Sequence, residues 1–379
     1  MQPQPAHSRK SARRWPIVVA ALAALLVVGG GATAVVWVAR SNHVKVATAA
    51  PRPVTPFNVI ATTPSASAKL VPSATTITVS FSAPIAPDSA RPTLAPPIPG
   101  TWSLVSASEL EFVASAPLVP GATESVLIPG GSSGMVSDQG QYLSASTTVP
   151  FSVATGSILR LQQLLAELGY LPLTFTPIAP MTSLTQAADV QQGTFGWRWP
   201  DQPAWLTSLW TPGEMNVITK GAIMDFEDQH NLKTDGQPGP AVWTDLLADA
   251  TTGHTDANPY RYVYVSQASP ETVTVYQDGA VAYKTLANTG VPGASTQPGT
   301  FTVFSRFLVT TMSGTNPDGT TYSDPGIPWV SYFNGGDALH GFIRGSYGFP
   351  QSDGCVEMPP SNAEIVYPMT PIGTLVTVS

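Results

Sequence analysis

The C-terminal third of the chain, residues 259–379, contains one cysteine, Cys355, and one histidine, His340. A free thiol is only a few per cent thiolate at neutral pH, so a nucleophilic cysteine needs a base or a positive neighbour. His340 is the histidine in this segment that can supply that base. The pair is therefore a candidate for covalent catalysis, with Cys355 as nucleophile and His340 as general base. The alternative from the residues alone is an inert buried thiol beside a structural histidine.

Small and polar residues flank both side chains. Gly341 follows His340, and the run Ser352-Asp353-Gly354 leads into the cysteine, which comes fifteen positions after the histidine. A glycine directly before the thiol allows close backbone approach, and consecutive N–H groups in such a turn can stabilise an oxyanion. The turn before Cys355 is therefore a candidate oxyanion hole.

The elements that must position this pair are predicted to be mostly strands. Asp278-Gly279 is typical of a tight hairpin turn between two of them. We therefore expect a compact, mostly-β domain over residues 259–379. Its predicted strands, rich in β-branched and aromatic residues, lie at 262–265, 272–276, 281–283, 299–304 and 373–378.

Three short motifs in this segment resemble the bacterial L,D-transpeptidase catalytic domain. They are His340-Gly341, the run Ser352-x-Gly354-Cys355-Val356 and, upstream, QPGTFTV at 297–303. The resemblance covers about residues 260–379. It implies an L,D-transpeptidase domain, for which we expect no cofactor and no metal.

The resemblance also implies a role for each matching residue. Cys355 would attack the carbonyl of the third residue of a tetrapeptide stem of peptidoglycan, with the terminal D-alanine leaving. His340 would be the general base, and the backbone carbonyl of Gly341 would orient its imidazole. The amides of Gly354 and Cys355 would stabilise the oxyanion, with Ser352 shaping the pocket. The side-chain amine of a diamino acid on a neighbouring stem would then take the acyl group, which cross-links two third residues.

Two residues depart from the family pattern. Asp353 stands where the family usually has histidine, and Glu357 stands where it often has arginine or asparagine. A carboxylate at Asp353 should raise the pKa of the thiol. Either it attracts the ammonium group of the acceptor, or it caps the turn by bonding backbone N–H groups. Tyr332 stands where family members carry a lid or oxyanion-side tyrosine, and the alternative is a packed aromatic.

Three functions are compatible with these residues. The first is a cross-linking L,D-transpeptidase with stem peptides as donor and acceptor. The second is an L,D-carboxypeptidase or cysteine peptidase on wall peptides, which needs only water as the acceptor. The third is an inactive wall-binding paralogue. The resemblance implies covalent labelling of Cys355 by a carbapenem, which would separate the third from the others.

Residues 157–250 are predicted to be helical around an insertion at 172–213. Apolar residues in SILRLQQLLAELGYL recur at three- and four-residue steps, and two more helices are expected in VITKGAIMDFEDQHNL and GPAVWTDLLAD. The pattern resembles a peptidoglycan-binding-like three-helix module. Four tryptophans of the insertion either stack on sugar rings or pack against the module or a neighbouring domain: Trp197, Trp199, Trp205 and Trp210.

Residues 57–153 are predicted to form a β-sandwich. Short alternating runs at 77–81, 101–104 and 109–113 are separated by turns rich in proline and glycine. Their order resembles the bacterial Ig-like domains of cell-surface proteins. We find no catalytic cluster in this part of the sequence, so we expect it to act as a spacer.

The N-terminal residues are predicted to anchor the protein in a membrane. After a basic segment at 1–15, an uncharged run at 16–39 would form a helix of roughly 36 Å, enough to cross a ~30 Å hydrocarbon layer. The alternative is a cleaved signal peptide with a small-residue site at 47–49. Residues 40–56 are a predicted linker. Because positive charge is greater before the run than after it, we expect a single-pass protein of the cell membrane, with a cytoplasmic tail and an extracytoplasmic catalytic body.

Charge excludes one class of partner. Residues 1–52 hold seven of the 17 Lys and Arg and none of the 24 Asp and Glu, so the rest of the chain is acidic. An acidic body repels nucleic acid and remains compatible with amine-bearing substrates. The single cysteine permits no intramolecular disulfide and, with five scattered histidines, no cysteine-type zinc site.

Overall fold

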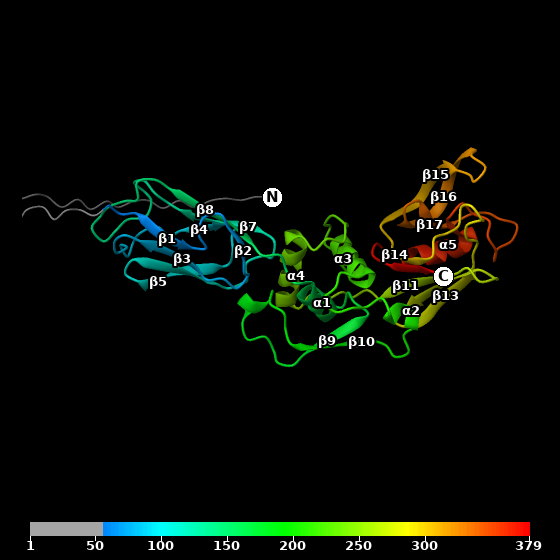
Figure 1. Ribbon diagram of the computed structural model, residues 1–379, viewed down its shortest axis with the longest axis horizontal. Helices are drawn as coiled ribbons and strands as arrows, with labels where there is room; N and C mark the ends of the chain where they lie inside the picture. Colours follow the sequence, from blue (N-terminus) through cyan, green and yellow to red (C-terminus); the bar gives the residue numbers. More distant parts are fainter. Residues whose placement is uncertain (1–55) are drawn as a thin grey trace, which may run out of the picture. The chain divides into compact units, whose positions relative to one another are not determined.

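The computed structural model describes residues 56–379. In Figure 1, the Ig-like strands, a helical segment and the C-terminal domain follow one another in colour from blue to red. Within these residues no helix is both long and apolar enough to cross a membrane. The predicted cytoplasmic tail, the membrane anchor at 16–39 and nearly all of the linker lie outside the described residues.

The Ig-like domain consists of two four-stranded sheets, with strand orders β1-β3-β6-β5 and β2-β8-β7-β4. In β3 the alternation found in the sequence turns Ile77, Val79 and Phe81 into the core. This confirms the predicted Ig-like sandwich. The strands are β1 Val59–Thr63, β2 Ala68–Val71, β3 Ile77–Phe81, β4 Thr93–Ala95, β5 Gly100–Ser106, β6 Glu109–Ala114, β7 Thr123–Ile128 and β8 Thr147–Val153.

The helical segment contains three helices of ten or more residues, at the predicted places. They are α1 (Ile158–Glu167), α3 (Val217–Gln229) and α4 (Pro240–Thr252), and they share one buried core. The insertion forms the hairpin β9 (Leu173–Pro177) and β10 (Gly193–Trp197), the short helix α2 (Ala204–Thr207) and the 3₁₀ turn η1 (Leu184–Gln186). The likeness of this segment to a peptidoglycan-binding module stays a prediction.

The tryptophans of the insertion pack against protein. Trp197, Trp205 and Trp210 contact the helical core. Trp205 also stacks on Tyr264 of the C-terminal domain, with 5.1 Å between ring centroids. Trp199 lies in the same way over Tyr260. These contacts favour the packing alternative over a free sugar-stacking surface.

The C-terminal domain contains two sheets, ordered β13-β12-β11-β19-β14 and β15-β16-β17-β18. Its main apolar core includes Val263 of the first sheet and Leu339 of the second. The predicted turn at Asp278-Gly279 has positive φ at both residues, 51° and 79°, as a tight hairpin turn requires. The elements are β11 Arg261–Ser266, β12 Thr272–Gln277, β13 Ala280–Leu286, β14 Gly299–Thr302, β15 Ser305–Thr315, β16 Thr321–Asn334, β17 Asp337–Gly341, β18 Val356–Met358, α5 Pro360–Val366, η2 Tyr367–Met369 and β19 Leu375–Val378.

Several elements of this domain were not predicted from the sequence. They are the long hairpin β15–β16, the strands β17 and β18, helix α5 and the 3₁₀ turn η2. Pro325 and Pro328 interrupt β16, and proline within a run argues against a strand. Helix α5 has seven residues, which is too short to show a helical period.

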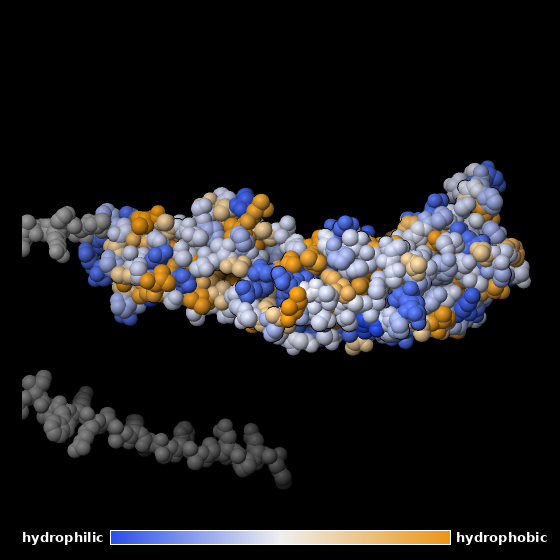
Figure 2. Space-filling model, turned by 60° about the horizontal axis from the view of Figure 1, so that its bottom comes forward, coloured by the Kyte–Doolittle hydropathy of each residue, from blue (hydrophilic) through white to orange (hydrophobic). Residues whose placement is uncertain are grey.

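The surface of the described residues mixes polar and apolar side chains. On the face shown in Figure 2, the apolar residues lie in several separate groups among polar ones. Large exposed apolar side chains on the hairpin include Leu308 and Val309 of β15.

Candidate active site

The pairing of β17 with β18 brings His340 and Cys355 together. The two strands are parallel, and His340 lies opposite Glu357. Cys355 comes two residues before Glu357, and side chains two residues apart in an extended chain share a face. The register therefore turns Cys355, Glu357 and His340 to one face of the sheet, where all three line one pocket.

The pocket has a volume of about 370 Å³. One part of its lining comes from β17, β18 and the loop between them. The other part comes from the hairpin β15–β16, through Met312, Asn316, Tyr322, Asp324 and Ile327. The hairpin that the sequence did not predict is thus a wall of the candidate site.

Backbone hydrogen bonds to residues 288–291 fix the chain around the cysteine. Asn288 and Glu357 exchange two N–H to carbonyl bonds of 2.9 Å each. On the other side of the cysteine, the Ser352 N–H donates to the Thr289 carbonyl at 3.0 Å. Cys355 is therefore held between two anchored points.

The turn before the cysteine depends on its serine and its glycine. The hydroxyl of Ser352 donates to the Cys355 carbonyl at 2.5 Å, so the buried serine holds the turn closed. Gly354 has φ of 103°, and a Cβ there would lie 2.6 Å from a carboxylate oxygen of Asp337. Within the described residues, the amides of Gly354 and Cys355 have no acceptor. Both N–H groups are thus free to bind an oxyanion.

His340 is buried, with only 3% of its surface exposed. Its Nδ1 lies 3.1 Å from the Gly341 carbonyl. A carbonyl can only accept, so Nδ1 carries the hydrogen and Nε2 is the basic nitrogen. Burial lowers the pKa of His340, against the opposing effects of the Gly341 carbonyl and of Glu357. The imidazole is therefore neutral at pH 7 and able to accept a proton.

The surroundings of Cys355 keep its thiol protonated at rest. Desolvation by the surrounding protein raises the pKa of the thiol to about 12. Three carboxylates act in the same direction, those of Asp337, Glu357 and Asp353. The thiol donates a long hydrogen bond to the Gly336 carbonyl, with 3.7 Å between Sγ and O. Activation therefore requires a base when substrate is bound, and catalytic hydrogen bonds often tighten only at that stage.

Glu357, one of the two departures from the family pattern, has a partner. Nε and Nη2 of Arg344 donate to its two carboxylate oxygens at 2.8 and 2.7 Å. Nη2 also donates to the Gln351 carbonyl at 3.1 Å, and the guanidinium lies over the ring of Phe342. This two-point ion pair compensates the negative charge beside the candidate catalytic residues.

Removing Arg344 should destabilise the protein more than removing the charge of Glu357. We expect Arg344→Met to destabilise the β17–β18 region by about 3 kcal/mol, because it leaves a buried carboxylate unpaired. Glu357→Gln should cost less, since the Arg344 side chain is 31% exposed and water can solvate it, whereas that of Glu357 is 5% exposed. Hydrogen exchange of peptides covering the two strands measures the local stability.

The exposed pair of Lys233 and Asp235 provides the matched control for this measurement. Lys233→Met should leave protection of the two strands unchanged, because exposed ion pairs contribute little. Equal loss of protection in Arg344→Met and Glu357→Gln would contradict the asymmetry.

Asp353 is exposed and lines the pocket with Cys355. Within the described residues its side chain makes no hydrogen bond, so the turn-capping alternative has no contact to support it. Tyr332 is half-buried on β16 and packs near Phe304, Phe307 and the thiol. It does not line the pocket, whereas Tyr322 of the same strand does.

Arg344 and Tyr322 were not predicted from the sequence. Arg344 had a signal, because residues 259–379 contain only four Lys and Arg and a carboxylate on a strand beside the nucleophile needs a cation. For Tyr322 we find no signal in the sequence, since its place follows from the pairing of β15 with β16.

Two family models match the chain. The L,D-transpeptidase catalytic domain matches residues 260–378, and the bacterial Ig-like domain matches residues 53–153. No curated protein matches the chain significantly.

Several solved structures are similar to the chain. An L,D-transpeptidase from Mycobacterium smegmatis is 16% identical, with 86% of this chain and 100% of that chain covered and a TM-score of 0.29. L,D-transpeptidase 3 from Mycobacterium tuberculosis, in complex with a faropenem-derived adduct, is 13% identical, with 85% and 97% covered and a TM-score of 0.29. The catalytic domain of the E. faecium L,D-transpeptidase, acylated by ertapenem, is 29% identical, with 33% and 100% covered and a TM-score of 0.29.

The protein is therefore a mainly-β multidomain protein, in which the Ig-like domain precedes the domain that matches the L,D-transpeptidase family model. Residues 260–378 are an L,D-transpeptidase catalytic domain. The family predicted from the motifs around His340 and Cys355 is confirmed.

Proposed function

We propose that this protein is a cell-wall L,D-transpeptidase that cross-links the third residues of peptidoglycan stem peptides through a thioester on Cys355. One observation carries the proposal. Cys355 and His340 face one pocket in a domain that matches the family model, and Nδ1 of His340 is bound to the Gly341 carbonyl. Nε2 is then the nitrogen that takes the thiol proton.

The first half-reaction forms the thioester. Nε2 of His340 takes the proton of Cys355 while sulfur attacks the carbonyl carbon of the third residue of the donor stem. The amides of Gly354 and Cys355 donate to the oxyanion of the tetrahedral intermediate. The bond to the terminal D-alanine then breaks, and His340 returns the proton to the leaving amine.

The second half-reaction returns the free thiol. The side-chain amine of a second stem attacks the thioester carbonyl and loses a proton to His340. The carbon–sulfur bond breaks as the new amide forms, and the proton passes to sulfur. Two stems enter the cycle, the cross-linked dimer and D-alanine leave, and the thiol is regenerated. The reaction therefore requires no cofactor.

The polar part of the pocket suits an amine-bearing acceptor. Asp324 and Asp353 line it, and neither forms an ion pair within the described residues. The charge of Glu357 is already matched by Arg344. Two carboxylates without cations in one pocket attract an ammonium group.

Product analysis tests this proposal. The full-length chain is incubated with disaccharide tetrapeptides that carry a diamino acid at the third position, and the products are identified by mass spectrometry. A transpeptidase releases one D-alanine for each cross-linked dimer. D-alanine with tripeptide and no dimer would instead identify a carboxypeptidase.

An inactive paralogue is distinguished by acylation. Ertapenem, which acylates the E. faecium domain, is expected to add its mass to the protein on Cys355. A chain that forms neither products nor adduct would be a wall-binding protein without chemistry. The proposed location, outside the cytoplasmic membrane, depends on the anchor predicted at 16–39 and is checked by cell fractionation.

Asp353 is expected to favour transfer to an amine over hydrolysis. Asp353→Asn keeps the shape and removes the charge, so attraction of the acceptor ammonium is lost. Acylation should be equal or faster, because one carboxylate that raises the pKa of the thiol is gone. The ratio of dimer to tripeptide should fall, and both rates are measured separately with the same donor.

Glu364→Gln is the matched control, since Glu364 is an exposed carboxylate of α5 outside the pocket. It should leave the ratio of dimer to tripeptide unchanged. The same ratio in Asp353→Asn as in the unmodified protein would remove Asp353 from acceptor binding.

A further inference from the structure

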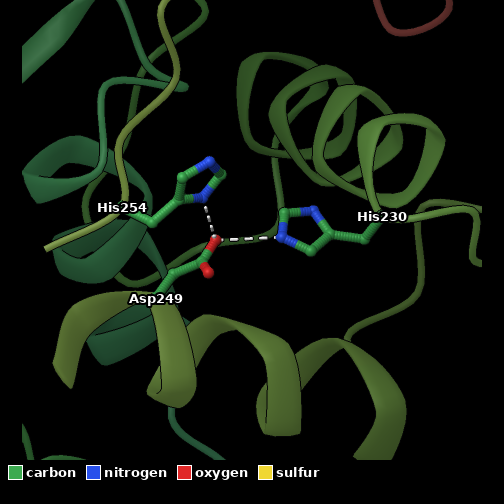
Figure 3. Close-up of side chains that lie close together, drawn as sticks. All are labelled: His230, Asp249 and His254. Atoms are coloured by element: carbon green, nitrogen blue, oxygen red, sulfur yellow. Dashed lines mark hydrogen bonds and ion pairs between the residues drawn. The ribbon is translucent and has the colours of Figure 1, made fainter. Parts of the chain in front are cut away.

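A second cluster of chemically active side chains lies outside the catalytic domain. His230 is the C-terminal cap of α3, Asp249 lies in the last turn of α4, and His254 follows the end of α4. Figure 3 shows the two imidazoles converging on one carboxylate oxygen of Asp249. Nothing in the proposed transfer reaction uses these residues.

The three side chains converge on a small volume. Nε2 of His230 lies 2.9 Å from Oδ2 of Asp249, and Nδ1 of His254 lies 3.1 Å from the same oxygen. One nitrogen or oxygen from each residue falls within 4.8 Å of the others. A tetrahedral zinc site with bonds near 2.0 Å separates adjacent ligand atoms by about 3.3 Å. The two nitrogen–oxygen distances therefore need to open by only a few tenths of an ångström, while the two imidazole nitrogens lie within 4.8 Å of each other.

A hydrogen bond to the backbone turns the second ring nitrogen of His230 into the cluster. Its Nδ1 lies 2.9 Å from the Phe226 carbonyl, which can only accept, so Nδ1 carries the hydrogen. In the neutral ring Nε2 is then an acceptor, and it faces a carboxylate oxygen that is also an acceptor. Two acceptors at 2.9 Å require a proton or a metal ion between them. Metal-bound histidines usually have this second hydrogen bond to a carbonyl.

Ring stacking and backbone hydrogen bonds fix the positions of the cluster residues. The ring of His230 stacks on Phe226, with 3.9 Å between centroids, which fixes its plane. Gly253 takes the left-handed conformation, with φ of 72°, and ends α4. The N–H groups of Gly253 and His254 both donate to the Asp249 carbonyl. The three ligands are thus held on helix ends rather than on a free loop.

We propose that His230, Asp249 and His254 bind a Zn²⁺ ion. Two imidazole nitrogens and one carboxylate favour a transition metal over calcium or magnesium, which prefer oxygen ligands alone. The side chain of His254 is 61% exposed, whereas those of His230 and Asp249 are 16% and 13% exposed. The open side of the site admits water as the fourth ligand.

The ion would join the ends of α3 and α4 to the segment that leads into β11 of the catalytic domain. Metal bound to the folded state stabilises it by mass action. A metal site in the helical segment was not predicted from the sequence. His230 and His254 are 24 positions apart, and only the packing of α3 against α4 brings them together.

Titration of the full-length chain with zinc chloride tests the proposal. All variants carry Cys355→Ala, so that the active-site thiol cannot bind the metal. Calorimetry of the chelator-treated protein should show one zinc ion per chain, and cobalt should give the strong visible absorption of tetrahedral coordination. His254→Ala and Asp249→Asn should each weaken binding by at least about 10-fold.

His43→Ala is the control, because it removes an imidazole from outside the described residues and should leave binding unchanged. His254→Ala is the principal variant, since its exposed side chain can be removed without opening the core. Absence of binding in the parent, or the same affinity in His254→Ala and the parent, would overturn the site and leave a hydrogen-bonded triad. The site would be established if His254→Ala and Asp249→Asn both bind zinc more weakly than the parent and if, in the presence of chelator, both unfold at the same temperature as the parent.

Discussion

Cys355→Ala is expected to abolish both the ertapenem adduct and the formation of cross-linked dimers. The chain has one cysteine, so no second thiol can take over the attack. Alanine removes the nucleophile and leaves the backbone of the turn, including the amides of Gly354 and residue 355, in place. Mass spectrometry of the intact protein after incubation with ertapenem checks the first loss, and product analysis checks the second.

Cys355→Ser provides the comparison, because it keeps a hydroxyl that is a much weaker nucleophile than a thiolate. It should acylate far more slowly than the unmodified protein and faster than the alanine variant. An adduct of full yield on Cys355→Ala would show that another group attacks. One candidate would be Ser352, whose hydroxyl donates a hydrogen bond to the carbonyl of residue 355.

The pairing of Cys355 with His340 could be predicted because these residue types are rare in the domain. One cysteine and one histidine in 121 residues leave a single pairing to consider, and the spacing of the motifs around them is specific. The strand alternation of the Ig-like domain was equally clear, since β3 buries every second residue. Local patterns of this kind depend on neighbours in the chain, which a sequence displays directly.

Contacts between distant segments could not be predicted in the same way. The wall of the pocket that carries Tyr322 depends on the register of β15 against β16, and β16 contains prolines that argue against a strand. The partner of Glu357 could not be predicted either, because the loop between the parallel strands β17 and β18 places Arg344 beside it. The aromatic partners of Trp205 are Tyr262 and Tyr264 of β11, which are far from it in the sequence.

His340→Ala is expected to slow acylation at pH 7 by about 100-fold or more, the scale of general base catalysis. The reason is the state of the thiol. With the pKa of Cys355 raised to about 12, only about one thiol in 10⁵ is ionised at pH 7 without help. A neutral, buried imidazole whose Nδ1 is bound to the Gly341 carbonyl can take the thiol proton during the attack, so the rate no longer depends on this small ionised fraction. The rate of ertapenem adduct formation measures the effect, with unchanged thermal unfolding as the control for folding.

The pH dependence separates a base from a residue that only supports the fold. In the unmodified protein the rate should fall as pH drops through the lowered pKa of His340, because the imidazolium can no longer accept the proton. Above that pKa the rate should level off. In His340→Ala the rate should instead rise about tenfold per pH unit from neutral to alkaline, because it follows the thiolate population of a thiol whose pKa lies above that range. The two profiles should therefore converge as pH rises. A His340→Ala protein that acylates at the unmodified rate at pH 7, or whose lower rate does not change with pH, would show that another group activates Cys355.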